Sequence, residues 1–370
     1  MAKKENELWN RLSAEGVKGP FITIMMNSNL TPQGTEKDQL KLKNFMKSAK
    51  KRFDKRYPDL DWTPFQLKFD QLFNDREFFR DTSTSVAIVL TAKEIYINRL
   101  SIRVDDQYYV GDTPYLLAMI KNEQFNYRYY LLALNRTSMS LYLMDNKKLT
   151  QVKLSDGAPI DMKTALGEEV TGGQVNFSHS TAAPAGVGYH STNAKDEEDE
   201  VDWNNYYQAI GKFLKNDFVN QEGLPLYLYA LPENQTTFKK NVNYAFYDPS
   251  FSISRSPAQL SRKELEKETE RITAELMQAE ISDYQKLMER KNFDQIADIK
   301  QAASLGRIDK FFISTNNLQE NFGDDPESEY DWRQVLNTTA RDVLRNNGNV
   351  YVLEEENAPG KKTLFASLRY

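Results

Sequence analysis

Residues 129–134 read YYLLAL, and two further stretches with apolar or alternating side chains follow them at 138–144 and 149–154. Short polar connections at 135–137 and 145–147 separate the three. Apolar runs of this length, bounded by turn-forming residues, are typical of strands. The sequence therefore predicts a three-stranded meander near the middle of the chain.

The hydrophobic pattern stops after this meander. Residues 167–202 are rich in Gly, Ser, Thr, Ala and Asn and end in an acidic run at 196–200, which predicts a long flexible loop. Between 203 and 218 the aromatic and aliphatic residues fall at helical spacing, and 224–231 reads as a buried strand. The predicted order is meander, loop, helix and strand.

The two ends of the chain repeat the mixture of helices and strands. Residues 21–26 form an apolar run, and a basic helix is predicted over 36–56. A long charged helix is predicted over 261–291, where Ser261 and Glu264 have the spacing of a capping box. Three strands complete this end, at 308–314, 350–353 and 364–370.

This pattern predicts an α/β (α+β) protein with three consecutive mixed-sheet domains. Their predicted ranges are 1–123, 124–250 with the loop at 167–202, and 258–370.

Composition excludes several classes of protein. The chain has 370 residues, 48 basic and 53 acidic side chains (48 − 53 = −5), no cysteine and two histidines. Disulfides, thiolate metal sites and cysteine nucleophiles are therefore excluded. There is no apolar run near the ~18 residues that a membrane span needs, and no secretory signal is visible, so we expect a cytoplasmic protein with no membrane partner.

One short motif suggests chemistry. Gly172-Gly173-Gln174 stands at the start of the predicted loop. Glycines allow a close approach of the backbone to a ligand, and the glutamine amide could orient a water molecule while backbone N–H groups hold developing negative charge. Alternatively, the motif is only the start of a flexible loop. His190 with Lys195 is a second candidate for the loop tip, and its alternative is an exposed histidine without a role.

The basic helix is the candidate for binding nucleic acid. Phe45, Phe53 and Tyr57 interleave with its basic side chains, so the helix could bind RNA phosphates with aromatic rings nearby for stacking. The alternative is an ordinary amphipathic helix whose aromatic residues face the core. The predicted RNA-binding residues on this helix are Lys43, Lys47, Lys50, Lys51, Arg52, Lys55 and Arg56, and Lys195 of the loop joins them.

The order of the segments resembles that of a known group of proteins. It is similar to the middle and C-terminal domains of the archaeal and eukaryotic class 1 peptide-chain release factors and of Pelota, and more similar to the bacterial archaeo-eukaryotic release factor families. The segments that carry the resemblance are 19–25, 130–134 with 140–142, 225–228, 302–312, 347–352 and 368–370.

The resemblance implies a protein that works on the ribosome and contacts ribosomal RNA and tRNA. In release factors a Gly-Gly-Gln loop promotes hydrolysis of the peptidyl-tRNA ester; carried over, Gly172 and Gly173 shape the loop and Gln174 positions the water. Here the motif stands well upstream of the predicted helix at 203. The alternative is a non-catalytic ribosome- or RNA-binding module that keeps the fold. The resemblance implies no metal or organic cofactor, and no stop-codon-reading motif is visible at the N-terminal end.

Overall fold

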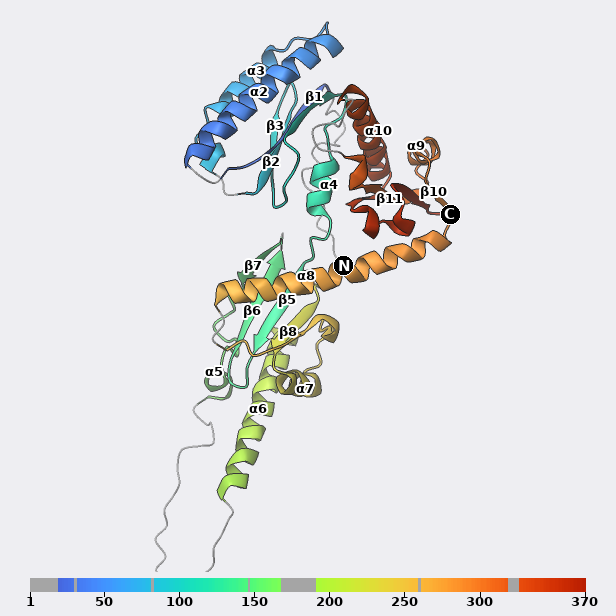
Figure 1. Cartoon of the computed structure of the whole chain (residues 1–370). Helices are drawn as coiled ribbons and strands as arrows, with labels where there is room; N and C mark the ends of the chain where they lie inside the picture. Colours follow the sequence, from blue (N-terminus) through green and yellow to red (C-terminus); the bar gives the residue numbers. More distant parts are fainter. Residues whose placement is uncertain are drawn as a thin grey trace, which may run out of the picture. The chain divides into compact units, whose positions relative to one another are not determined.

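Three sheets organise the chain, and each takes all its strands from one consecutive part of the sequence (Figure 1). The structure is a computed structural model. It describes residues 19–29, 32–80, 83–145, 147–167, 191–258, 261–318 and 326–370. Within these residues no helix is long and apolar enough to cross a membrane.

The N-terminal sheet has the strand order β3-β2-β1-β4 and is antiparallel throughout. Its strands are β1 (Phe21–Asn27), β2 (Ser85–Leu90), β3 (Ile95–Leu100) and β4 (Gln107–Gly111). Helices α2 (Pro32–Arg56) and α3 (Thr63–Phe73) cover one face (Figure 1). A 3₁₀ turn, η1 (Phe78–Arg80), leads back to the sheet.

The middle sheet has the order β7-β6-β5-β8-β9, with β5, β8 and β9 parallel. Its strands are β5 (Tyr129–Leu134), β6 (Met139–Asp145), β7 (Lys148–Gln151), β8 (Leu226–Ala230) and β9 (Ile253–Ser254). Its helices are α5 (Met162–Leu166), α6 (Ser191–Asn216) and α7 (Pro232–Asn241). Tyr206, Ile210 and Phe238 anchor α6 and α7 in the core of this sheet.

The C-terminal sheet has the order β10-β13-β11-β12. Its strands are β10 (Asn292–Phe293), β11 (Ile308–Ser314), β12 (Asn349–Leu353) and β13 (Leu364–Leu368), with β11 and β12 parallel. The helices of this part are α8 (Arg262–Gln285), α9 (Ile296–Ser304) and α10 (Pro326–Arg345). Short 3₁₀ turns, among them η4 (Thr315–Asn317), connect them.

The chain divides into two compact units. The middle unit is Asn126–Met277, and what we call the split unit joins the N-terminal residues up to Phe125 with Gln278–Tyr370. The boundary falls inside α8. The N-terminal and C-terminal sheets therefore belong to one unit, and a single hydrophobic cluster holds residues of both, such as Met25, Tyr109, Ile313 and Leu336.

Buried polar side chains of α10 join the two halves of the split unit. Arg333 is fully buried, and its guanidinium donates to Glu329 (2.8 Å) and Gln107 (2.9 Å). Asn337 accepts from the backbone N–H of Leu116 at 2.6 Å. Because a buried polar group that loses its partner is costly, these contacts fix α10 against the N-terminal half.

Helix α4 (Leu117–Glu123) follows the last strand of the N-terminal sheet and packs beside β12, the edge strand of the C-terminal sheet. It lies in the split unit, so the N-terminal sheet, α4 and the C-terminal sheet are parts of one body. The boundaries predicted from the sequence for three domains stay a prediction.

The predicted α/β class with three sheets is confirmed, although the N-terminal sheet is antiparallel rather than mixed. The predicted meander forms, with its third strand ending at Gln151 rather than at 154. The capping box at the start of α8 is also confirmed, since the Ser261 backbone N–H donates to Glu264 at 2.9 Å and the Glu264 N–H to the Ser261 hydroxyl at 3.3 Å.

The predicted end of the long loop, at residue 202, was wrong. Residues 191–202 are helical, because α6 begins at Ser191 and the acidic run 196–200 lies within it. The sequence did not indicate that α6 begins at Ser191, because the residues of this helix before Trp203 are mostly polar and show no apolar periodicity. Residues 168–190 of the predicted loop lie outside the described residues.

Candidate nucleic-acid interface

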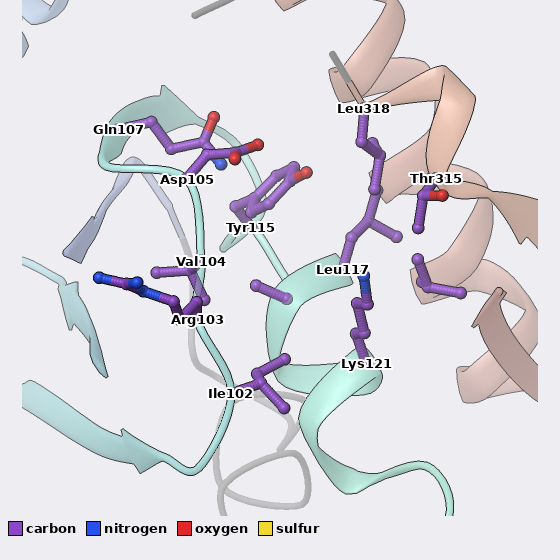
Figure 2. A pocket seen from close by; sticks show the side chains of 12 residues that line it. Ile102, Arg103, Val104, Asp105, Gln107, Tyr115, Leu117, Lys121, Thr315 and Leu318 are labelled. Atoms are coloured by element: carbon purple, nitrogen blue, oxygen red, sulfur yellow. The ribbon is translucent and has the colours of Figure 1, made fainter. Parts of the chain in front are cut away.

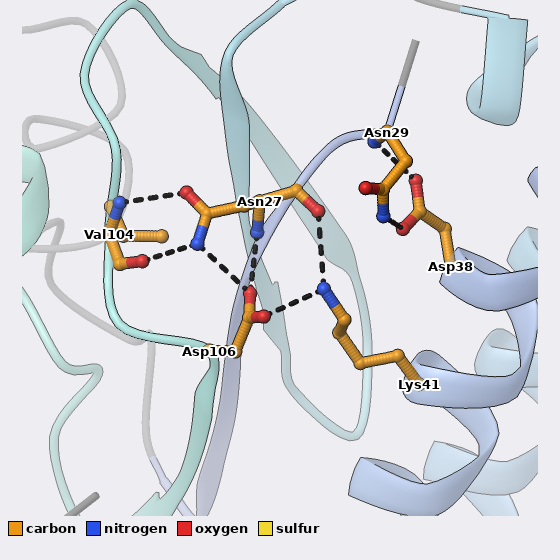
Figure 3. A network of polar contacts seen from close by, with 6 residues as sticks. All are labelled: Asn27, Asn29, Asp38, Lys41, Val104 and Asp106. Atoms are coloured by element: carbon orange, nitrogen blue, oxygen red, sulfur yellow. Dashed lines mark hydrogen bonds and ion pairs between the residues drawn. The ribbon is translucent and has the colours of Figure 1, made fainter. Parts of the chain in front are cut away.

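Helix α2 is fixed on the N-terminal sheet by its apolar face and by a polar network at its beginning. Leu42, Met46 and Ala49 are buried against the sheet. Figure 3 shows that Lys41 reaches from α2 to Asp106, at 2.7 Å, and that the Asp106 carboxylate also accepts the backbone N–H of Asn27 at 2.6 Å. The opposite face of α2 is thereby held toward solvent.

Four lysines stand on that opposite face at every fourth residue. We call Lys43, Lys47, Lys51 and Lys55 the lysine row; all four side chains are exposed, and none forms an ion pair within the described part of the chain. With a rise of ~1.5 Å per residue, successive lysines are about 6 Å apart along the axis and the row is about 18 Å long. In a chain with a net charge of −5 this is a concentrated positive surface.

The other basic residues predicted on this helix are already engaged. Lys50 pairs with Asp54 at 2.7 Å. The guanidinium of Arg52 lies 3.8 Å above the centre of the Tyr330 ring and donates to both carboxylate oxygens of Glu327, at 3.1 and 2.8 Å. Arg56 is 3.7 Å from Asp112. At about 100° per residue, Arg52 and Arg56 point away from Lys43 and Lys47, although Arg52 is only about 60° from Lys55.

The aromatic residues of α2 face inward. Phe53 is fully buried against Trp62 and Phe65, and Phe45 and Tyr57 are half-buried. The Tyr57 hydroxyl donates to Asp112 at 2.6 Å, and burial together with this carboxylate raises the pKa of Tyr57. Stacking of bases on Phe53, the second half of the sequence hypothesis, is therefore wrong. What α2 offers is charge alone.

The lysine row costs stability. Like charges four residues apart on a helix destabilise it by ~0.2–0.5 kcal/mol per pair, so the three adjacent pairs of the row together cost about 1 kcal/mol. Helix α8 shows the opposite arrangement, because Arg271 and Glu275 pair at the same spacing, at 3.0 Å. A repulsive row on an exposed helix is expected where a negatively charged partner compensates for it.

The candidate catalytic residues are not described by the structure. Gly172, Gly173, Gln174 and His190 lie outside the described residues, and Lys195 belongs to α6 without a described side chain. The start of α6 still matters for them. α6 begins at Ser191 and not at residue 203. Fewer residues therefore separate the Gly-Gly-Gln motif from the helix than the sequence predicted.

A small cavity of about 210 Å³ lies in the split unit between residues 102–107, α4 and η4 (Figure 2). Three charged side chains line it. Lys121 pairs with Glu354 (3.4 Å) and Asp105 lies 3.8 Å from Arg333, while Arg103 is exposed. Burial raises the pKa of Tyr115, which lines the cavity, to about 12. Within the described residues, no group of His, Asp or Glu side chains could hold a metal ion.

Comparison with known families identifies the middle of the chain. Residues 127–275 match the family model described as bacterial archaeo-eukaryotic release factor family 6. These residues fall within the middle unit and contain the β5–β9 sheet, the Gly-Gly-Gln motif and α6. The release-factor-like resemblance predicted from the sequence is confirmed for residues 127–275. No curated protein sequence matches the chain.

Solved structures give distant likenesses. An archaeal translation termination factor, aRF1, is 12% identical, with 98% of this chain and 96% of that chain covered and a TM-score of 0.24. Archaeal Pelota, from a model of its ribosome-bound form with ABCE1, is 10% identical over 75% of this chain and 72% of that one, with a TM-score of 0.37. Dom34 of S. cerevisiae is 11% identical over 80% and 78%, with a TM-score of 0.36.

Proposed function

We propose that this chain is a ribosome-associated, release-factor-like protein of the cytoplasm that acts in translation termination, ribosome rescue or quality control. The observation that carries the proposal is the lysine row, on a chain whose middle segment matches a release factor family. Ribosomal RNA is the partner proposed for the row, because exposed lysines without protein partners are suited to phosphate.

The electrostatics support a local rather than a global attraction. The whole chain is acidic, so its net charge alone would repel RNA. The row places four positive charges within about 18 Å of helix axis. Acidic residues farther from a bound phosphate than the ~8 Å screening length at physiological salt repel it only weakly. The row can therefore bind phosphates while acidic residues elsewhere are largely screened.

Hydrolysis of peptidyl-tRNA is the activity proposed for the middle unit. It is favoured by Gly172-Gly173-Gln174, which lies inside the family-matched residues 127–275. In this proposal Gln174 orients the attacking water, backbone N–H groups of the loop stabilise the oxyanion, and the ribosome supplies the rest of the site. The alternative is a non-catalytic module that binds the ribosome or RNA without hydrolysis.

The test of ribosome binding is co-sedimentation of the full chain with 70S ribosomes across a salt series. A variant with all four row lysines changed to Gln has a net charge of −9 (−5 − 4) and should lose most of the salt-sensitive binding. The matched control changes four exposed lysines elsewhere, Lys93, Lys263, Lys267 and Lys300, to Gln and has the same net charge. Equal losses in both variants would contradict an interface at the row.

Hydrolysis is followed in the same tubes as release of peptide from peptidyl-tRNA. Gln174→Ala should abolish release and leave binding unchanged if the motif is catalytic. Binding with no release by the unaltered protein would support the non-catalytic alternative. Release that Gln174→Ala does not reduce would exclude the proposed role of this residue.

A further inference from the structure

The surroundings of the lysine row indicate which form of RNA the row binds. We infer that the row binds the backbone of an RNA duplex in preference to single-stranded RNA. The inference rests on the proposed function, which makes RNA the partner of the row, and it narrows that partner to one structural class.

The first argument is the absence of a stacking platform on the exposed face of α2. Proteins that bind single strands combine a positive groove with aromatic side chains on which successive bases stack. Here Phe53 is fully buried, with its ring 5.1 Å from that of Trp62 and 5.3 Å from that of Phe65. Tyr57 is held by Asp112. Phe45 is half-buried, with its ring 6.2 Å from that of Tyr108. The unstacked bases of a single strand would therefore find no fully exposed ring on α2 to replace their own stacking.

The second argument is the chemistry of the charges that remain. Arginine can stack on a base or read its edge with a planar fork, but lysine is a compact point charge. The arginines of α2 are occupied, Arg52 by Tyr330 and Glu327 and Arg56 by Asp112. The row therefore consists only of ammonium groups, which suit phosphates and lack the planar fork that stacks on bases. Duplex RNA is recognised mostly in this way, through its shape, phosphates and 2′-hydroxyls.

The third argument is rigidity. α2 is fixed by its buried face and by the ion pair of Lys41 with Asp106, so the backbone positions that carry the four lysines stand at fixed steps of about 6 Å along the axis. A duplex also holds its phosphates at fixed, regular positions. Two preorganised partners lose little conformational freedom on binding, whereas a flexible single strand must first be ordered.

The experiment compares one labelled RNA duplex with each of its two separated strands, chosen to be unstructured, by fluorescence anisotropy with the full chain across a salt series. We expect the duplex to bind at least ~10-fold more tightly than either strand at equal salt. Loss of four phosphate contacts reduces the slope of log affinity against log salt by about 3.6 for a duplex (0.9 × 4). We expect the four-lysine row variant to show this reduction, and the Lys93, Lys263, Lys267, Lys300→Gln control to keep the slope.

Two results would overturn the inference: strands that bind as tightly as the duplex, or a duplex affinity that both variants reduce equally. This failure can be separated from failure of the proposed function. If ribosome co-sedimentation depends on the row while single strands bind best, only the preference for a duplex is wrong. If co-sedimentation does not depend on the row, the proposed interface itself is wrong.

Discussion

The hydroxyl of Tyr330 lies 2.7 Å from both the backbone nitrogen and the carbonyl oxygen of Val110, accepting from the first and donating to the second. Val110 belongs to β4, an edge strand of the N-terminal sheet, and Tyr330 belongs to α10 of the C-terminal half. One side chain thus satisfies the two groups that a neighbouring strand would satisfy. Since Arg52 of α2 packs on the Tyr330 ring, the same tyrosine also steadies the helix that carries the lysine row.

The first prediction concerns a variant that lacks the hydroxyl of Tyr330. Tyr330→Phe keeps the ring but leaves a buried N–H and a buried C=O without this partner, at a cost of ~1–3 kcal/mol each. We expect the free energy of unfolding, measured with urea, to fall by about 2–6 kcal/mol. The control is Tyr370→Phe, at a side chain that is 76% exposed, which should change stability by less than ~0.5 kcal/mol. A similar small change at Tyr330 would show that water replaces the hydroxyl.

A reciprocal contact closes the edge of the C-terminal sheet. The amide of Gln124, just after α4, accepts the N–H of Val352 at 2.8 Å and donates to its carbonyl at 2.5 Å. Val352 lies in β12, the outer strand of that sheet. Each half of the split unit therefore supplies one side chain that completes the edge strand of the other, which ties together segments more than 200 residues apart.

The second prediction tests this contact by pH. In Gln124→Glu an ionised carboxylate still accepts from the Val352 N–H but faces the Val352 carbonyl, so burial beside that oxygen should raise the pKa of the new carboxyl above its unfolded value. The folded variant then binds the proton more tightly, and its stability should fall as pH rises through that pKa. Urea unfolding at acid and neutral pH measures this. Gln124→Ala lacks both bonds and should show no such extra dependence.

Sequence patterns predicted the parts of this molecule that depend on local spacing. The apolar run at 129–134 became β5, and Ser261 with Glu264 formed the capping box. The buried face of α2 follows from helical periodicity, although one leucine of this helix, Leu40, is 60% exposed.

Contacts between distant segments could not be predicted in this way. No local pattern reveals that Tyr330 would meet Val110, or that Arg52 would be used to hold α10 rather than to bind RNA. Side chains of one residue type have different roles here because the tertiary partners differ. The arithmetic of 100° per residue separates the two arginines of α2 from Lys43 and Lys47 before the structure is seen, but it leaves Arg52 only about 60° from Lys55.

The third prediction concerns a carboxylate between the halves of the split unit. The Thr315 hydroxyl donates to Glu354 at 2.5 Å, and this hydrogen bond, together with the nearby Lys121, holds the pKa of Glu354 below its ordinary value of 4.5. A carboxyl with a lowered folded pKa contributes stability above its unfolded pKa and loses it as pH falls through the folded value.

Thr315→Val removes the donor to Glu354. The variant should be less stable than the unaltered protein at neutral pH, by about 1 kcal/mol because the site is partly screened by solvent. The difference should disappear in acid, below the folded pKa, where Glu354 is protonated in both proteins. Urea unfolding across this range measures it. A difference that stays constant with pH would mean that Thr315 acts by packing and not through the charge of Glu354.

The last prediction separates a binding role of the lysine row from a structural one. Lys47 has Lys43 four residues before it and Lys51 four residues after it. Lys47→Glu replaces two repulsive pairs by two attractive ones, each worth ~0.2–0.5 kcal/mol in either direction, so we expect the free energy of unfolding to rise by about 1 kcal/mol. The same change should weaken binding to ribosomes and to duplex RNA, because it puts a negative charge in the middle of a phosphate-binding surface.

If the lysine row serves to bind a partner, Lys47→Glu should raise the free energy of unfolding and weaken binding. Lys47→Gln is the matched intermediate, since it removes the repulsion without adding attraction or a negative charge, and it should lie between the two proteins in both stability and binding. If Lys47→Glu were less stable and bound ribosomes unchanged, the row would be a structural feature of α2. The cost of about 1 kcal/mol that the row imposes on its own helix would then have no compensating partner.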